Sequence, residues 1–589
     1  MKIKKSGNGK RDPAFSAGSR PKNKYLIYIW TKYNIALKKF LILIVLIGWN
    51  VSAQNLFLKI SGKTDFETKV IDSTLYLKKH LTSKSVFDEV NSVSYKLIKF
   101  GYIDNQNLGN KKINDSTILF DFNLGQKIKS IHIYISRNSE LRNLLIFDSK
   151  TDTLVIAYSE IEKYLNESLQ KLEQNGFALS KLKLINISRQ KNYLEAELSL
   201  IADKKRNVNN IVINGYDKFP AGYKKNISRK YKNLVFNKIN LKKINTDFNK
   251  IRFVKQIKYP EILFTKDATN IYVYIEKAKT NSFDGFIGFA NDESQNLIFN
   301  GYVDLALKNA LNIGEKLALY WKSDGKNQKT FNVATEIPYV FKSPIGIKAQ
   351  LNIFKQDSIF QNTKTNIDLG YYLNLNSKVY LGYQETESND INNLNSSILS
   401  DSKNSFITST FEFVDFNTDN NLFPEKTNFN FKIGSGKRNS KTQSNNQFFS
   451  SLLINYHFYL NEKNAINIKT HNYYLKSENY ITNELFRFGG INSIRGFNEN
   501  SLQGNTFLSL ITEYQFVLSR GLYFHSVLDY GYLNDKTVNK TTKLLGLGFG
   551  FGLQTKNGLL NFIYANGSNN DQAVKLSNSV VQISLKTNF

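Results

Sequence analysis

The spacing of hydrophobic and polar residues changes once along this chain, near Ser282. Before that point, stretches with apolar residues at helical spacing alternate with short stretches in which every second residue is apolar. A helix is predicted over 85–100, and it ends at Gly101, a common helix-stop residue. After Ser282, the helical spacing disappears and the period of two continues to the last residue. The sequence therefore predicts helices and strands first, and strands alone afterwards.

The order of helices and strands recurs three times before the change. Strands and helices are predicted, in chain order, at 56–60, 85–100 and 116–124, then at 131–135, 158–175, 182–187 and 193–201, then at 208–215, 216–255, 261–265 and 270–276. A repeat of roughly 75 residues predicts a tandem array, in which each copy is a small three-stranded sheet with helices on one face. The predicted domains are 54–126, 127–205 and 206–279. A single larger α+β domain is the alternative.

The region 280–589 predicts a sheet with one apolar and one polar face. Leu297, Phe299, Val303 and Leu305 share one face, whereas Asn300 and Asp304 lie on the other. This pattern is typical of a transmembrane β-barrel, which has lipid outside and water inside. Only a closed sheet can span a bilayer, because unpaired backbone groups are costly in hydrocarbon. At about 19 residues per strand and connection, the region predicts about 16 antiparallel strands. A soluble β-sandwich or propeller is the alternative.

Composition excludes several other classes of protein. The chain of 589 residues is 41% hydrophobic, with a mean hydropathy of -0.37, so it is not a bundle of membrane helices. It contains no cysteine, which excludes disulfides and thiolate chemistry, and its five histidines are scattered. No catalytic, metal-binding or cofactor-binding group is predicted, and no enzyme. The net charge of +30 comes from dispersed lysines, which suits an anionic membrane surface better than nucleic acid.

A signal peptide is predicted near the N-terminus. Lys38 and Lys39 precede an apolar run at 40–48, and the small residues of 51–53 follow it. This pattern predicts cleavage between Ala53 and Gln54, so that 1–53 form an N-terminal extension and signal peptide. The apolar run is shorter than the about 20 residues that a membrane-spanning helix needs. A single N-terminal anchor helix is the alternative.

The third repeat carries a specific resemblance. Its strand IVING at 211–215, the Phe219-Pro220 pair after it, and its ending at 260–262 and 273–276 resemble a POTRA domain. POTRA domains are the periplasmic modules of the BamA/TamA family of outer-membrane proteins. The first two repeats resemble this module more loosely. The resemblance implies α+β POTRA repeats followed by an all-β outer-membrane barrel.

The stretch FRFGGINSIRGF at 486–497 resembles the loop motif of the same family, which ends in Arg-Gly-Phe or Arg-Gly-Tyr. In the family, this loop folds into the barrel lumen, and its arginine meets acidic residues on the following strands. TEYQF at 512–516 and VLDYG at 527–531 match those strands, although Val527 stands where the family usually has Phe. The resemblance implies a lumenal loop lock formed by Arg495, Gly496, Phe497, Glu513, Asp529 and Gly531. Without the resemblance, the alternative for 486–497 is a surface hairpin in which Arg495 is solvated. The alternative for Glu513 and for Asp529 is an ordinary polar residue of the lumen.

The resemblance also implies a function and a location. We expect an assembly or translocation factor in the outer membrane, with its POTRA domains in the periplasm. It would insert or export client β-proteins. The implied partners are unfolded outer-membrane or secreted proteins, outer-membrane lipids, and a periplasmic or inner-membrane protein. A two-partner secretion transporter that exports one partner protein is one alternative, and a passive porin or receptor barrel is another.

The first and last barrel strands, near 283–290 and 580–589, are expected to meet at a weak lateral seam. Gly285 and Gly288 lack packing side chains, which suits a weak edge. Residues 580–584 are expected to pair opposite Gly288, and the predicted seam also includes Val580 and the terminal Phe589. A client strand could pair there by β-augmentation.

Overall fold

The computed structural model describes residues 55–136, 145, 152–201, 203–291, 297–324, 328–393, 395–396, 398–417, 420, 422–441, 443–556, 558–571 and 579–589. The predicted cleavage residues Ala53 and Gln54 lie outside this part of the chain. The described residues form two compact units, one ending at Leu169 and including Lys181–Ile201, the other comprising Gln170–Ser180 and Ala202–Phe589. None of the described helices is both long enough and apolar enough to cross a membrane.

The first module contains two helices and a four-stranded sheet. Its elements are β1 (Leu56–Gly62), α2 (Asp65–Asp72), β2 (Lys79–His80), α3 (Ser83–Lys99), β3 (Gln106–Asn114) and β4 (Thr117–Asn123). The strands are ordered β2-β1-β4-β3. Helix α3 begins at the N-cap Thr82, whose side chain accepts a hydrogen bond from the Ser85 N–H. It buries Val86, Val90 and Val93, which recur at helical spacing and form the core with the sheet.

Two further modules repeat this arrangement. The second consists of β5 (Ser130–Tyr134), β6 (Thr153–Ala157), η2 (Tyr158–Glu160), α4 (Ile161–Gln174), β7 (Lys181–Arg189) and β8 (Tyr193–Ile201). The third consists of β9 (Asn210–Asn214), α5 (Ala221–Tyr231), α6 (Lys238–Lys250), β10 (Val254–Phe264) and β11 (Thr269–Lys277). In every module the first strand pairs in parallel with the last, and the last pairs antiparallel with the strand before it. The modules are therefore copies of one topology.

The sheets of the first two modules differ from the expected three strands. Each has a fourth strand at one edge, β2 in the first module and β6 in the second. Strand β2 spans two residues, which is too short to show any period. Strand β3 is exposed at all nine positions, so its sequence QNLGNKKIN needs no alternation. Strands β2 and β3 therefore carry no hydrophobic signal.

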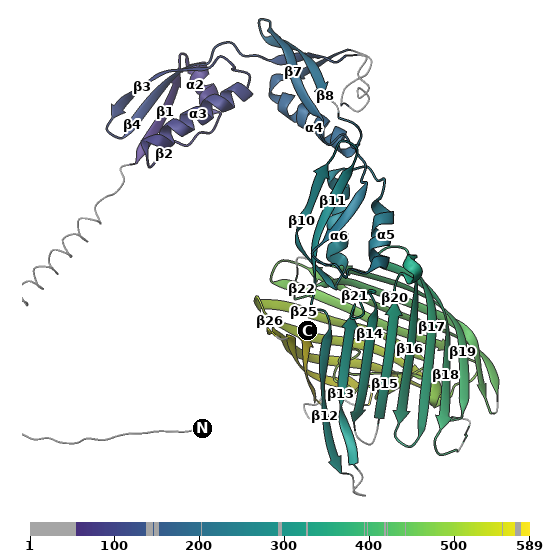
Figure 1. Ribbon diagram of the computed structural model, residues 1–589. Helices are drawn as coiled ribbons and strands as arrows, with labels where there is room; N and C mark the ends of the chain where they lie inside the picture. The colour runs from purple at the N-terminus through teal and green to yellow at the C-terminus, as the bar shows by residue number, and fades with distance from the viewer. Residues whose placement is uncertain are drawn as a thin grey trace, which may run out of the picture. The chain divides into compact units, whose positions relative to one another are not determined.

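The C-terminal region is a closed barrel of 16 antiparallel strands, as predicted. The strands are β12 (Ser282–Asn291), β13 (Leu297–Lys308), β14 (Lys316–Asp324), β15 (Gln328–Ile337), β16 (Ile345–Gln356), β17 (Phe360–Tyr372), β18 (Ser377–Asp390), β19 (Ser402–Phe416), β20 (Glu425–Ser440), β21 (Ser444–Tyr459), β22 (Asn464–Lys476), β25 (Thr506–Ser519), β26 (Leu522–Asp535), β27 (Lys540–Gln554), β28 (Gly558–Asn569) and β29 (Ser579–Asn588). Figure 1 shows them side by side, with the C-terminus beside the start of β12.

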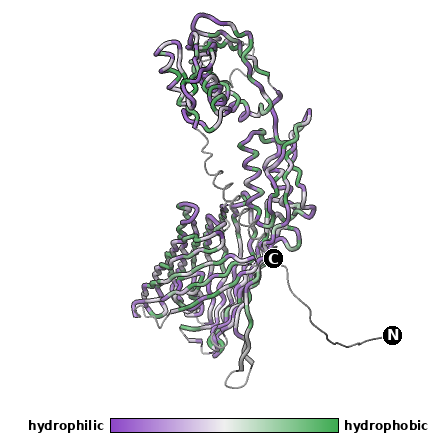
Figure 2. Tube along the Cα trace, turned by 90° about the vertical axis from the view of Figure 1, so that its left-hand side faces the viewer, coloured by the Kyte–Doolittle hydropathy of each residue, from purple (hydrophilic) through white to green (hydrophobic). Residues whose placement is uncertain are grey.

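Polar residues of the barrel point inward and apolar residues point outward. On β17, Asn366 and Asp368 are 5% and 7% exposed, whereas their neighbours Ile367 and Leu369 are 59% and 58% exposed. Hydrophilic and hydrophobic residues alternate along the strands in Figure 2. A soluble protein has the opposite distribution, because apolar side chains leave water when it folds. The outer face therefore suits lipid, and the inner face suits a hydrated lumen.

The third module contacts turns at one rim of the barrel. Tyr216 accepts a hydrogen bond from the Asn309 side chain (2.8 Å) and donates one to Asn312 (3.0 Å), in the turn between β13 and β14. The Asn226 side chain donates to the Ser343 carbonyl (3.2 Å), in the turn between β15 and β16. These polar contacts mark the rim at which the chain enters the barrel.

Candidate functional site

The connection between β22 and β25, residues 477–505, is called the long loop below. It contains the 3-10 turn η4 (Thr482–Glu484) and a small hairpin of β23 (Phe486–Phe488) and β24 (Leu502–Gly504). The predicted motif occupies β23 and the tip of this hairpin. Phe488 and Ile494 are buried against Phe507 of β25 and Leu544 of β27. The long loop therefore packs against the inner wall of the barrel.

The structure brings Arg495 together with both predicted carboxylates. Its guanidinium binds Asp529 through two nitrogens, with Nε to Oδ2 at 2.8 Å and Nη2 to Oδ1 at 2.5 Å. Its Nη1 donates to Glu513, and its backbone N–H donates to Asp529 at 2.9 Å. The side chains of Arg495 and Asp529 are 2% and 0% exposed, and that of Glu513 is 20% exposed. This fork geometry is the one in which arginine binds carboxylates most strongly.

Glycines make room for the tip of the long loop. A Cβ on Gly531 would lie 2.1 Å from the Cδ1 of Ile494, which occupies that space. Gly496 has a φ of 88°, and a Cβ there would lie 2.3 Å from the backbone nitrogen of Gly567. A side chain at Gly496 is therefore excluded both by conformation and by space. Phe497, the last predicted residue of the lock, packs at the edge of the same apolar cluster.

Two glycines of the barrel wall that the sequence analysis did not single out also make room for the tip of the long loop. A Cβ on Gly546 of β27 would lie 2.4 Å from the Arg495 carbonyl oxygen, and one on Gly567 would lie 2.4 Å from that of Gly496. For Gly546, the signal that could have revealed it is the run GLGFGFG at 546–552, which is unusual in a strand. It indicates that another stretch of backbone approaches the strand closely.

A second buried ion pair fixes the other end of the long loop. Glu484 binds Arg438 of β20 at 2.5 Å, and both side chains are nearly inaccessible. Gln447 of β21 also donates to the Glu484 carboxylate, at 2.7 Å. The neighbouring Asn483 donates to Ser388 of β18 at 2.6 Å. The sequence analysis missed this attachment, and the one available signal is that Arg438 falls at an inward position of its strand.

Further contacts tie the long loop to other strands. Glu499 accepts a hydrogen bond from Tyr320 (3.0 Å) and forms an ion pair with Lys322, both on β14. Arg487 donates to Gln356 of β16 at 3.0 Å, and its guanidinium lies over the ring of Phe360 on β17. The long loop is thus held by strands on several sides of the lumen.

The first and last strands meet over a very short ladder. Among the described residues, β12 and β29 pair at Ser282–Asn588 and Phe283–Thr587 alone. By contrast, β12 pairs with β13 along its whole length, and β29 pairs with β28 from Ser579 to Thr587. The Phe589 N–H also donates to the Asn281 carbonyl at 3.0 Å. The barrel is therefore closed at this seam by a few bonds near one rim.

The predicted seam residues do not pair with one another. Gly285 and Gly288 pair with β13, opposite Val303 and Asn300, and Val580 pairs with Ala565 of β28. The expectation that residues 580–584 pair opposite Gly288 is wrong, because the ladder between β12 and β29 ends at Phe283. The neighbour that approaches Gly285 closely is β13, since a Cβ there would lie 2.5 Å from the Tyr302 carbonyl oxygen.

Comparison with solved structures finds outer-membrane proteins of low sequence identity. No protein-family model and no curated protein sequence matches it. BamA from Haemophilus ducreyi lacking POTRA domains 1–3 is 14% identical, with 78% of this chain and 100% of that chain covered and a TM-score of 0.47. CdiB from Escherichia coli is 12% identical, with 85% and 98% covered and a TM-score of 0.49. POTRA domains 3–5 of BamA from Haemophilus influenzae are 15% identical, with 38% and 98% covered and a TM-score of 0.26.

The class of protein follows from the chain's own structure. Repeated α+β modules precede a closed barrel of 16 antiparallel strands with an apolar outer face. The fold predicted from the sequence, α+β repeats followed by a barrel of about 16 antiparallel strands, is confirmed. Identities this low carry no information about what the chain binds or does.

Proposed function

We propose that this chain assembles or translocates β-proteins in the outer membrane, and that client strands enter the barrel at the seam between β12 and β29. The observation that carries the proposal is the ladder of two residue pairs at this seam. From Asp284 onward, one edge of β12 has no partner on β29 within the described residues. Such an edge is a template for an added strand, whose backbone can complete the ladder.

The attachments of the long loop support a lateral route over transport through the lumen. A protein exported through the lumen would have to displace a loop held by the ion pairs of Arg495 and Glu484. Both pairs are buried, and breaking a buried pair is costly. Opening the seam requires the loss of two ladder pairs and the few bonds beside them. The lateral route therefore disrupts fewer strong contacts.

The modules and the outer face complete the proposal. The barrel lies in the outer membrane, with lipid against exposed residues such as Ile407 and Ile583, which are 75% and 63% exposed. The modules face the periplasm, where exposed edge strands such as β3 offer a second place for client strands to pair. A passive porin needs neither the modules nor a fixed loop. The proposal includes no enzymatic step.

A disulfide across the seam tests the proposal. Ser282→Cys and Asn588→Cys place one cysteine on each strand at a paired position, and the chain has no other cysteine. We expect the oxidised protein to remain folded in the membrane and to lose its ability to maintain outer-membrane protein levels in depleted cells. Reduction should restore this ability, because it frees the seam.

A matched pair serves as the control. Leu560→Cys and Leu585→Cys join β28 to β29 within a long ladder, so their disulfide should leave function unchanged. Full function of the oxidised seam variant would contradict lateral entry. It would make transport through the lumen, as in a two-partner secretion transporter, the better proposal.

A further inference from the structure

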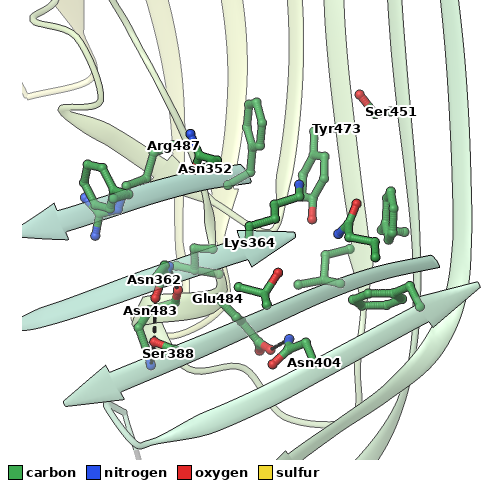
Figure 3. Close-up of a pocket in the computed structure, with 18 of the residues that line it drawn as sticks. Asn352, Asn362, Lys364, Ser388, Asn404, Ser451, Tyr473, Asn483, Glu484 and Arg487 are labelled. Carbon is green, nitrogen blue, oxygen red and sulfur yellow. Dashed lines mark hydrogen bonds between the residues drawn. The ribbon is translucent and has the colours of Figure 1, made fainter. Parts of the chain in front are cut away.

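A cavity of about 400 Å³ lies in the barrel between the long loop and the inner wall. Its wall residues come from β15 to β22, and Asn483, Glu484 and Arg487 of the long loop close one side. Most of the lining consists of amide, hydroxyl and aromatic side chains. Figure 3 shows Lys364 extending toward Tyr473 across this space, with Asn352, Asn404 and Asn483 around it. The cavity is distinct from the Arg495 lock and from the seam.

Three cationic side chains line the cavity without a matching carboxylate. They are Lys364 of β17, Lys432 of β20 and Arg487 of β23. In the part of the chain that the structure describes, none of them forms an ion pair, and the Lys364 ammonium makes no hydrogen bond. Lys432 donates to Gln384 (2.9 Å), a neutral amide. The single lining carboxylate, Glu484, is already paired with Arg438.

Unpaired cations in a confined space favour an anionic ligand. Lysine ammonium groups donate to phosphate or carboxylate oxygens through charge-assisted hydrogen bonds, which are stronger than neutral ones. The inner wall also screens these charges less than bulk water does. Lys364 and Lys432 lie on strands three apart in the barrel order and line the same cavity. Both side chains therefore contribute positive charge to the same cavity.

Uncharged polar groups around the three cations favour a ligand whose uncharged part carries several hydroxyl groups. The Oδ1 of Asn483 and the Oγ of Ser402 are buried and accept no hydrogen bond within the described residues. Both side chains line the cavity, and each acceptor can take a hydrogen bond from a ligand hydroxyl once the side chain rotates toward it. Phe354 and Tyr473 add aromatic surface to the same lining. Amides and hydroxyls that surround a few aromatic rings suit a ligand with polar edges and an apolar C–H face.

We propose that this cavity binds a small sugar that carries a phosphate or a carboxylate group. Lys364 and Lys432 bind the oxyanion, Arg487 adds a third positive charge, and Asn483 with its neighbouring amides binds the hydroxyl groups. The volume of about 400 Å³ suits one sugar unit with its charged group. The proposal does not depend on the function proposed above.

Titration calorimetry on the full chain in detergent micelles tests the proposal. The probes are glucose 6-phosphate and glucuronate, which distinguish the phosphate from the carboxylate, with glucose and inorganic phosphate as comparisons. We expect at least one anionic sugar to bind in saturable fashion, and glucose to bind more weakly. Lys364→Gln and Lys432→Gln should each weaken binding by about tenfold, because each removes one charge-assisted contact. Added salt should also weaken binding.

Lys437→Gln is the matched control, because Lys437 is an exposed lysine on the same strand as Lys432. It should leave affinity unchanged. An unheated gel, on which a folded barrel migrates differently from an unfolded one, shows that each variant is folded.

Three results would overturn the proposal. The first is the absence of saturable binding of both anionic sugars to the wild-type chain. The second is unchanged affinity in the folded double variant of Lys364 and Lys432, which would place the ligand elsewhere. The third is equal affinity for inorganic phosphate and glucose 6-phosphate, which would mean that the hydroxyl groups are not recognised.

Discussion

Replacing Arg495 by alanine should release the tip of the long loop from the wall. The variant loses every guanidinium bond to Asp529 and Glu513 and keeps the backbone bond to Asp529. Asp529 is fully buried, so its charge would then lie in the wall without a cationic partner. Removing one partner of a buried ion pair costs about 3–5 kcal/mol. The retained backbone bond and the exposed part of Glu513 favour the lower end of this range.

A cost of about 3 kcal/mol shifts the equilibrium between the docked and the released loop on the order of a hundredfold. A cysteine at Ser493 can measure this shift, since Ser493 is 7% exposed and the chain has no other thiol. We expect slow labelling by an impermeant thiol reagent while the lock is intact, and much faster labelling in Arg495→Ala. In Arg495→Lys, the cysteine at Ser493 should be labelled almost as fast as in Arg495→Ala. An ammonium group cannot bind two carboxylates in the way that the planar guanidinium does.

The control for this experiment is Arg520→Ala, because Arg520 is an exposed arginine in the turn between β25 and β26. A double-mutant cycle with Asp529→Asn then measures the interaction free energy between Arg495 and Asp529. The double variant should destabilise the docked loop by less than the sum of the two single variants. Equal labelling rates at Ser493 in the wild type and in Arg495→Ala would refute the reasoning. The ion pairs would then not be what holds the tip of the loop.

Two further substitutions test other contacts of the long loop. Gly531→Ala should destabilise the docked loop by about 1–3 kcal/mol, because the added methyl group overlaps the Cδ1 of Ile494. Ile494→Val removes that atom and should restore slow labelling at Ser493, so failure of this rescue would contradict the steric explanation. Glu484→Gln leaves the buried Arg438 without a carboxylate, and a cysteine at Leu485 should then label faster while labelling at Ser493 stays slow. Equal acceleration at both positions would mean that the two attachments are not independent.

Much of the fold could be predicted from the sequence because its signals are local. Alternation on β17 places Asn366 and Asp368 inside and Ile367 outside, as the period of two implies. The helix at Ser83–Lys99 carries its apolar residues at helical spacing, so its prediction over 85–100 was close. Edge strands β2 and β3 were not predicted, because they bury almost no side chains and a strand without burial has no hydrophobic pattern.

The long-range contacts of the site were harder to predict from the sequence. Arg495 could be matched to its partners because the resemblance gave their order along the chain. Glu484 could not, since it lies in a loop without periodicity and its partner Arg438 comes from a strand 46 residues earlier. The length of the ladder between β12 and β29 could not be predicted either, because it depends on where the two strands diverge in space. No spacing along the chain records that divergence.

The attachments of the long loop and the short ladder of the seam both support the proposed lateral entry of client strands. Within the described residues, hydrogen bonds of the loop's side chains reach β14, β16, β18 to β21, β25 and β26, and none reaches β12 or β29. The loop therefore braces the wall away from the seam and leaves the seam strands free. If the loop crossed the seam, every opening would have to break a buried ion pair. Because it does not, the opening proposed between β12 and β29 would break their own short ladder and leave the lock of Arg495 closed.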